Sequence, residues 1–243
     1  MQILWILATI LTCRSFQLKS FPLLWIFVFI ALRLWINGEI GSCTAHGTTG
    51  LLRYLRIKNK VKDVPLSRLQ LYYDARVLAG FPVKEDSGAT VRAAIKSANA
   101  KGVAEEFFWP YIISKFAVKP SADTYVNAAL HQTIKYFTIK NNVASLKQAL
   151  ADGNPIVFGI DLFESFEGKM AITTGIVPMP DEANENELGG HCMYIVGYGQ
   201  KKGYFTVRNS WGTSVGDKGD FYLPEAIFAR YANSFWVITS EEF

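Results

Sequence analysis

The 243-residue sequence has only three cysteines, Cys13, Cys43 and Cys192. So few cysteines cannot form a paired disulfide framework, which indicates a reducing compartment more than an oxidising one. A strong charge of one sign is also missing, because 25 Lys and Arg face 21 Asp and Glu. The basic residues are scattered, and this favours a solvated surface over a nucleic-acid-binding stripe. Without internal repeats or low-complexity linkers, the length fits one large domain or two small lobes that share a cleft.

Residues 1–36 are much more apolar than the rest of the chain. They hold two apolar runs, 1–12 and 21–36, and the second has a proline near its start and contains Arg33. A membrane-spanning helix needs about 20 predominantly apolar residues, and a cleaved signal peptide needs a basic start and a small-residue cleavage site. Neither run meets either description. Three interpretations stay open for residues 1–36: a signal anchor, a membrane-associated hairpin, or a stretch that is not the native start of the domain. A cytoplasmic and a membrane-associated protein are therefore both compatible with the sequence.

After residue 37 the hydrophobic pattern is first helical and then rich in strands. Apolar residues at helical spacing predict helices over 43–57, 66–78, 90–100 and 143–151. Runs of β-branched and aromatic residues predict strands over 155–163, 193–199, 204–210, 220–224 and 234–240, the second and third joined as a hairpin. Residues 107–111 are expected to form an aromatic turn, and the acidic stretch 181–187 an exposed loop. Helices followed by strands indicate an α+β protein with two lobes.

Cys43 follows a Gly-Ser turn and begins a predicted helix. Unpaired backbone N–H groups and the helix dipole favour negative charge at this position. A thiol there is expected to ionise more readily, and the thiolate is the reactive form of cysteine. Cys43 is therefore a candidate nucleophile, with a buried structural cysteine as the alternative.

His191 and Asn209 are the candidate partners of Cys43. His191 follows the pair Gly189-Gly190, which lets the backbone approach a ligand closely, and is expected at the mouth of an apolar strand. Asn209 ends another predicted strand, and its amide can accept one ring N–H of a histidine and so fix the tautomer. The order Cys, His, Asn, with 148 residues between Cys43 and His191, matches the spacing of papain-type catalytic residues.

Two other arrangements of the same residues are weaker. His46 lies three residues after Cys43 and shares a helix face with it, but a Cys43–His46 dyad lacks an orienting group. A zinc site of Cys43, His46, His191 and Cys192 is disfavoured, because adjacent strand residues such as His191 and Cys192 point to opposite faces. No metal ligand set is therefore predicted, and Cys192 is expected in the core.

Three blocks of this sequence resemble the active-site blocks of papain-like cysteine peptidases: GSCTA (41–45), LGGHCMYIVGYG (188–199) and YFTVRNSWGTSVGDKGDFYLP (204–224). The resemblance runs from about Gly38 to about Trp236 and is strongest to the subgroup of bacteria, archaea and large viruses that is poor in disulfides and has no prosegment. It implies a peptidase domain over 37–243, with a helical lobe at about 43–125, a β-barrel-like lobe at about 126–240, and an active-site cleft between them.

The resemblance also implies a role for each matching residue. Cys43 corresponds to the nucleophile, His191 to the base and acid, and Asn209 to the group that orients the histidine. Trp211 is expected to shelter the His–Asn contact. The substrate groove is expected to be lined by Ser87, Gly88, Gly189 and Gly190, with the substrate backbone pairing at Ser87-Gly88.

This chain departs from the family pattern before the nucleophile. Asn37 occupies the position of a glutamine that donates to the oxyanion, and its side chain is one methylene shorter. Loss of such a donor typically reduces turnover about 10²–10³-fold, so oxyanion binding is expected to need Asn37, or else the Cys43 N–H alone. Ile40 stands where many secreted members have a disulfide cysteine, and Thr44 replaces a frequent Trp or Tyr.

The function expected from these features is cysteine-type endopeptidase activity on peptide or protein substrates. It needs no metal or organic cofactor and no nucleic acid, and a monomer is expected. One alternative is a catalytically impaired papain-like scaffold that binds peptides or a protein partner. The other is a membrane-tethered member of the family, anchored through residues 1–36.

Overall fold

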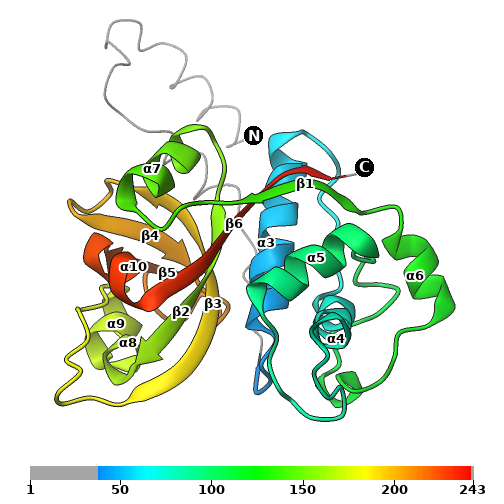
Figure 1. Ribbon diagram of the computed structural model, residues 1–243, viewed down its shortest axis with the longest axis horizontal. Helices are drawn as coiled ribbons and strands as arrows, with labels where there is room; N and C mark the ends of the chain where they lie inside the picture. The colour runs from blue at the N-terminus through cyan, green and yellow to red at the C-terminus, as the bar shows by residue number, and fades with distance from the viewer. Residues whose placement is uncertain (1–37, 242–243) are drawn as a thin grey trace, which may run out of the picture.

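The computed structural model describes residues 38–241 of the chain. The sequence-based expectations for residues 1–36 and for Asn37 therefore lie outside the described residues. Within 38–241, none of the helices is both long enough and apolar enough to cross a bilayer. The described part has the predicted α+β class, with the helices of residues 43–128 on one side and the sheet with four short helices on the other (Figure 1).

The first half of the described chain is helical. It contains α3 (Cys43–Lys58), α4 (Arg68–Ala79), α5 (Val91–Ala100), the short 3-10 helix η1 (Ile113–Lys115) and α6 (Ala122–Ala128). Side-chain oxygens cap the starts of three of these helices, Ser67 for α4, Thr90 for α5 and Ser121 for α6, by accepting a backbone N–H from the first turn. Gly80 ends α4 in the left-handed conformation, with φ of 73°. The predicted helices at 43–57, 66–78 and 90–100 are thus confirmed.

The second half contains a six-stranded antiparallel sheet and four short helices. The strands are β1 (Thr133–Thr138), β2 (Ile156–Phe163), β3 (Glu187–Tyr198), β4 (Tyr204–Arg208), β5 (Asp220–Pro224) and β6 (Ala232–Glu241), and their order is β1-β6-β2-β3-β4-β5. The helices are α7 (Val143–Ala151), α8 (Glu164–Glu167), α9 (Lys169–Thr174) and α10 (Glu225–Tyr231). β1 and β6 run along the junction of the two lobes, where they contact α5 and α3 (Figure 1).

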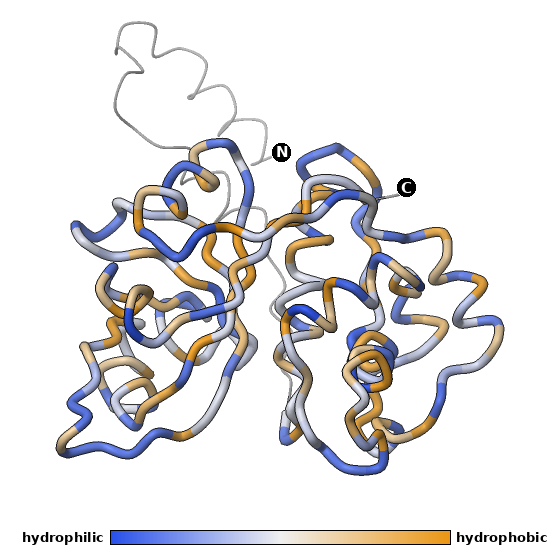
Figure 2. The backbone as a smooth tube through the Cα atoms, in the orientation of Figure 1, coloured by the Kyte–Doolittle hydropathy of each residue, from blue (hydrophilic) through white to orange (hydrophobic). Residues whose placement is uncertain are grey.

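The sheet has a hydrophobic core on each of its two faces. One core joins Phe158, Met193 and Phe205 to helices α7 to α10. The other joins Cys192 and Tyr194 of β3 to α3, α4 and α5. Alternate residues of β3 therefore serve opposite cores, as the period of a strand requires. Hydrophilic segments lie at the rim of the molecule, such as the loop before β3 at the lower left of Figure 2.

Two glycines let helix α3 approach strand β3 closely. A Cβ atom on Gly47 would lie 3.0 Å from the sulfur of Cys192, and one on Gly50 would lie 2.8 Å from the ring of Tyr194. Only a helix face without side chains can pack at this distance. The helix that begins at Cys43 is thereby brought against the strand that carries His191.

The elements differ from the sequence-based expectations at the start of β3 and in several short elements that were not predicted. Strand β3 begins at Glu187, not at residue 193, so His191 lies inside a strand and the prediction that it stands at the strand's mouth is wrong. The Gly-Gly pair hid these strand residues, because glycine has low strand propensity. The strand β1 and the helices α6, α8, α9 and α10 were not predicted, since all are short and only weakly periodic.

Candidate active site

Cys43 is the first residue of α3 and is half-buried. Burial raises the pKa of its thiol, while the backbone N–H groups of Cys192, Thr44 and Cys43 itself oppose this by stabilising negative charge on the sulfur. The sulfur therefore lies close to the backbone of β3 immediately after His191. This places the candidate nucleophile where a thiolate, once formed, meets hydrogen-bond donors from two elements.

Asn209 follows the last residue of β4 and binds the ring of His191. The Asn209 Oδ1 atom lies 2.8 Å from His191 Nε2 and 2.7 Å from the backbone nitrogen of Ser210. The Ser210 N–H can only donate, which fixes the amide oxygen on this side of the Asn209 side chain. His191 Nε2 must then carry a proton and donate it to the same oxygen. The neutral imidazole has its lone pair on Nδ1, so Nδ1 is the atom that can accept a proton.

Two opposing effects act on the pKa of His191. Burial lowers it, because the charged imidazolium loses hydration, and the hydrogen bond to Asn209 raises it. Asn209 is itself 2 % exposed, so this bond is shielded from water. The geometry thus favours a histidine that is neutral at rest and that gains stabilisation from Asn209 when it is protonated.

Trp211 packs over this hydrogen bond from the loop after β4. Its ring centroid lies 5.4 Å from that of His191, with a tilt of 31° between the planes. It also makes edge-to-face contacts with Phe166 and Phe221, at centroid distances of 5.5 and 6.0 Å. These contacts hold the indole in the core of the sheet lobe, and the position matches the sheltering role expected for Trp211.

Cys43 and His191 line the same groove between the two lobes. Of the residues predicted to bind substrate, Ser87, Gly88 and Gly190 also line it. Gly189 lies just outside that lining, with φ of 114° and open space where a Cβ would stand. Asn37 lies outside the described residues, so its predicted role stays a prediction.

Several residues of the groove were not predicted from the sequence. They are Gly41, Thr44, Phe81, Ala89, Thr90, Val91, Gly159, Ile160, Asp161, Asn233 and Ser234. Those from β2 and β6 reach the groove only because these strands are neighbours in the sheet. Nothing in the local sequence around Asp161 or Asn233 marks them, and only the strand pairing could have found them.

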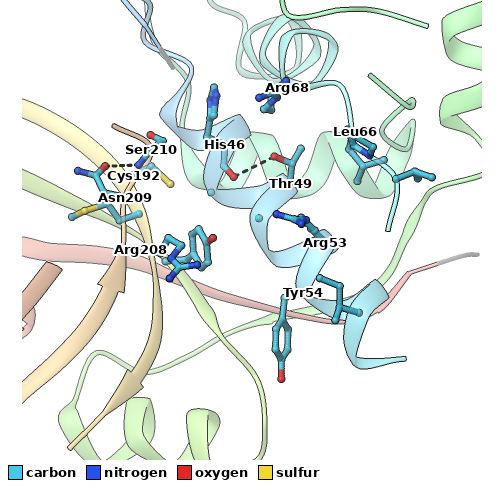
Figure 3. A pocket seen from close by; sticks show the side chains of 17 residues that line it. His46, Thr49, Arg53, Tyr54, Leu66, Arg68, Cys192, Arg208, Asn209 and Ser210 are labelled. Carbon is cyan, nitrogen blue, oxygen red and sulfur yellow. Dashed lines mark hydrogen bonds between the residues drawn. The ribbon is translucent and has the colours of Figure 1, made fainter. Parts of the chain in front are cut away.

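His46 does not line the groove but lines a second pocket beside α3 (Figure 3). It is 6 % exposed, and its Nδ1 lies 3.1 Å from the carbonyl oxygen of Ser42. Its ring packs edge-on against Tyr111 at 5.2 Å. Cys43 does not line this pocket, whose other wall includes Asn209 and Ser210. The arrangement favours a structural role for His46 over the Cys43–His46 dyad.

Comparison with known proteins identifies the family of this chain. A family model described as the papain family cysteine protease matches residues 36–230. The chain belongs to the papain family of cysteine proteases. The matched range includes Cys43, His191 and Asn209, and all the groove residues except Asn233 and Ser234.

Relatives in this family come from viruses, bacteria and animals. The chain is 38% identical over 213 residues to a peptidase C1-like protein of Acanthamoeba polyphaga mimivirus, covering 83% of this chain and 68% of the relative. It is 28% identical to pro-cathepsin H of Mus musculus, over 77% of this chain and 54% of the relative. The chain thus spans about two thirds of the viral relative and about half of the animal one.

A solved structure has a similar fold. Xylellain, a cysteine protease from Xylella fastidiosa, superposes with a TM-score of 0.81 at 30% identity, covering 91% of this chain and 90% of that one. The cysteine protease CMS1MS2 of Carica candamarcensis has a TM-score of 0.64 at 19% identity and 88% coverage of this chain. These structures confirm the predicted papain-like two-lobe fold. The protein is a papain-family cysteine peptidase, and peptides or proteins are its class of substrate.

Proposed function

We propose that this protein is an endopeptidase in which Cys43 is the nucleophile, His191 the base and acid, and Asn209 the orienting group. The observation that carries the proposal is the hydrogen bond from His191 Nε2–H to Asn209 Oδ1. This bond leaves His191 Nδ1 as the proton acceptor in a groove that Cys43 also lines. Residues 37–243 are proposed as the peptidase domain and residues 1–36 as a separate leader.

The first half of the reaction forms an acyl-enzyme. The Cys43 thiol gives its proton to His191 Nδ1, and the sulfur attacks the carbonyl carbon of the scissile peptide. Burial disfavours each charged group alone, but a thiolate and an imidazolium in proximity stabilise each other. The Cys43 N–H at the start of α3 stabilises the oxyanion, together with the amide proposed for Asn37. His191 then protonates the leaving amine, the C–N bond breaks, and a thioester remains on Cys43.

The second half restores the enzyme. A water molecule gives a proton to His191 Nδ1 and attacks the thioester carbonyl. The C–S bond breaks, the sulfur takes back the proton from His191, and a carboxylic acid leaves. Throughout both halves Asn209 keeps the ring in one orientation, and its bond is strongest while the ring is charged.

The test is turnover of a peptide-amide substrate under reducing conditions by the wild-type chain, Cys43→Ala and His191→Ala. Both substitutions are expected to abolish turnover above the uncatalysed rate, while Cys192→Ala, at the neighbouring buried cysteine, keeps it. Equal rates for wild type and Cys43→Ala would overturn the assignment of the nucleophile.

Two further measurements separate the alternatives. A catalytically impaired scaffold would bind peptides without turnover, and Cys43 would be alkylated by iodoacetamide no faster than a free thiol. A membrane-tethered peptidase would turn over substrate and would also resist extraction from membranes by carbonate. Removal of residues 1–36 would then release the activity into the soluble fraction.

A further inference from the structure

The hydroxyl of Tyr72 links two segments that border the groove. Tyr72 lies in α4 and is fully buried. Its hydroxyl donates a hydrogen bond to the Asp86 carboxylate and accepts one from the backbone N–H of Gly88, at 3.1 Å. Burial and the neighbouring carboxylate raise the pKa of Tyr72, so its hydroxyl keeps the proton that it donates. The helical core thus holds the groove wall at residues 86–88.

Asp86 in turn holds the turn before the candidate nucleophile. Both of its carboxylate oxygens accept the backbone N–H of Gly41, at 3.1 and 3.0 Å. Gly41 is two residues before Cys43, and the same turn leads directly into α3. Asp86 therefore joins three segments: α4 through Tyr72, the wall at Gly88, and the turn at Gly41.

Gly41 of the turn and Gly88 of the wall face each other through backbone atoms alone. A Cβ on Gly41 would lie 3.1 Å from Gly88 Cα and 3.3 Å from Gly88 N. No side chain at either position can therefore fix how one backbone sits against the other. The hydrogen bonds of Asp86 and Tyr72 supply that constraint.

We propose that Tyr72 and Asp86 form a clamp that sets the position of the Cys43 sulfur relative to the substrate-binding backbone at Gly88. Both are positioning residues, since Asp86 acts through Gly41 and Tyr72 acts through Asp86 and Gly88. The proposal rests on the proposed function, because it concerns the distance from a nucleophile to a substrate held on the wall. Neither residue was singled out by the sequence.

The charge of Asp86 argues for a positioning role over an activating one. Burial raises the pKa of the Cys43 thiol most, the backbone donors lower it, and the Asp86 carboxylate raises it further. A negative charge near the sulfur disfavours the thiolate. A carboxylate at this place therefore acts against nucleophile activation, and its evident contribution is to accept the hydrogen bonds of Gly41 and Tyr72.

The test compares two reagents that react with the same sulfur. Iodoacetamide alkylates Cys43 without any peptide backbone bound in the groove. A peptidyl epoxide reacts only when its backbone is held on the wall at the correct distance from the Cys43 sulfur. Tyr72→Phe is the main variant, because it removes one hydroxyl and keeps the ring. Tyr73→Phe is its matched control: it makes the same change one residue later on α4, outside the clamp.

Tyr72→Phe is expected to slow labelling by the peptidyl epoxide roughly tenfold, the scale of one to two hydrogen bonds. Labelling by iodoacetamide should change less than twofold, and Tyr73→Phe should match wild type with both reagents. Asp86→Ala should give a larger loss than Tyr72→Phe. Asp86→Asn should recover part of that loss, because an amide oxygen can still accept a hydrogen bond from Gly41.

Three results would decide against the clamp. They are epoxide labelling of Tyr72→Phe within twofold of wild type, equal slowing by both reagents, and an Asp86→Asn variant no better than Asp86→Ala. If Asp86→Ala fails to fold, the Tyr72→Phe comparison still decides. Failure of the proposed function is distinct: wild-type Cys43 would then react with neither reagent faster than a free thiol does.

Discussion

The hydrogen bond between His191 and Asn209 gives the sharpest quantitative prediction. Asn209→Ala removes the acceptor that lies 2.8 Å from His191 Nε2. A hydrogen bond to a charged group typically contributes about 1.5–3 kcal/mol. At about 1.36 kcal/mol per tenfold, this corresponds to a fall of roughly 10- to 150-fold in kcat/KM. The loss should appear mainly in kcat, because the imidazolium forms during the reaction and not on substrate binding.

The variant Asn209→Asp keeps a side chain that can orient the His191 ring but changes its charge. A carboxylate can still accept the Nε2–H of His191 and the N–H of Ser210. Its charge should raise the pKa of His191, whereas Asn209→Ala should lower it, because the present bond to Asn209 raises that pKa. Because His191 must be neutral to take the proton of Cys43, its protonation sets the acid limb, and this limb should move to higher pH in Asn209→Asp and to lower pH in Asn209→Ala.

The assay is steady-state hydrolysis of a peptide amide at 25 °C across a pH series, with urea unfolding of each variant. Asn184→Ala is the matched control, because Asn184 is exposed and its side chain bonds only to the nearby Asp181 among the described residues. An Asn209→Ala variant that is folded and within twofold of wild type would refute the orienting role. So would acid limbs that move in the opposite directions.

Three further predictions concern the framework of the site. Asp220→Ala should lower the free energy of unfolding by about 3–5 kcal/mol, because it removes the carboxylate that pairs with the buried Arg208 guanidinium. Glu225→Ala breaks a partly exposed ion pair with Lys147 and should cost at most about 1 kcal/mol. Equal urea midpoints of the two variants would contradict this. Gly47→Ala should lower kcat/KM despite the better helix propensity of alanine, since the added methyl would meet β3 at 3.0 Å and push the nucleophile helix outward; unchanged kcat/KM would refute it. Burial lowers the pKa of His131 in the folded protein, so as pH falls the unfolded chain takes up this proton before the folded chain does. The stability that neutral His131 contributes is therefore complete above the unfolded pKa of about 6.5 and is lost as pH falls through that value. His131→Gln should therefore show a smaller loss of urea midpoint between pH 7 and pH 5.5 than wild type, and an identical loss would contradict the shift.

The candidate triad could be read from the sequence because its signals are local. A small-residue turn before a helix marks Cys43, and an Asn-Ser-Trp turn after a strand marks Asn209. Each of these short sequence blocks can be recognised without knowing where the rest of the chain lies in space. The helices around Cys43 were predicted for the same reason, since the helical spacing of apolar residues is also a local feature.

The residues that hold these blocks in place could not be read in this way. Asp86 accepts from a backbone N–H 45 residues earlier in the chain, and Tyr72 lies in another helix. A tyrosine in an amphipathic helix is more simply interpreted as a core residue, and an Asp-Ser-Gly sequence as a turn. Their function depends on which segments become neighbours, and neither periodicity nor composition carries that information.

The orientation of His191 also depends on contacts that the local sequence does not reveal. Arg208, directly before Asn209, forms two short bonds to Asp220, at 2.6 and 2.7 Å, and both side chains are buried. The Asn209 N–H also bonds to the Gly219 carbonyl at 3.2 Å. The loop from 209 to 219 is therefore closed at its base by a buried ion pair and a backbone hydrogen bond. Asn209 starts this loop, so a loosened base would let its amide oxygen drift from His191 Nε2.

It follows that Asp220→Ala should reduce catalysis as well as stability. Below its unfolding midpoint, the folded variant should show a lower kcat with little change in KM, because the substrate groove does not include residues 208 or 220. Its acid limb should move in the direction of Asn209→Ala, since both changes weaken the bond that stabilises the imidazolium. In the double variant the two losses should not add, because both act through one hydrogen bond. Fully additive losses in kcat would show that the ion pair serves folding alone.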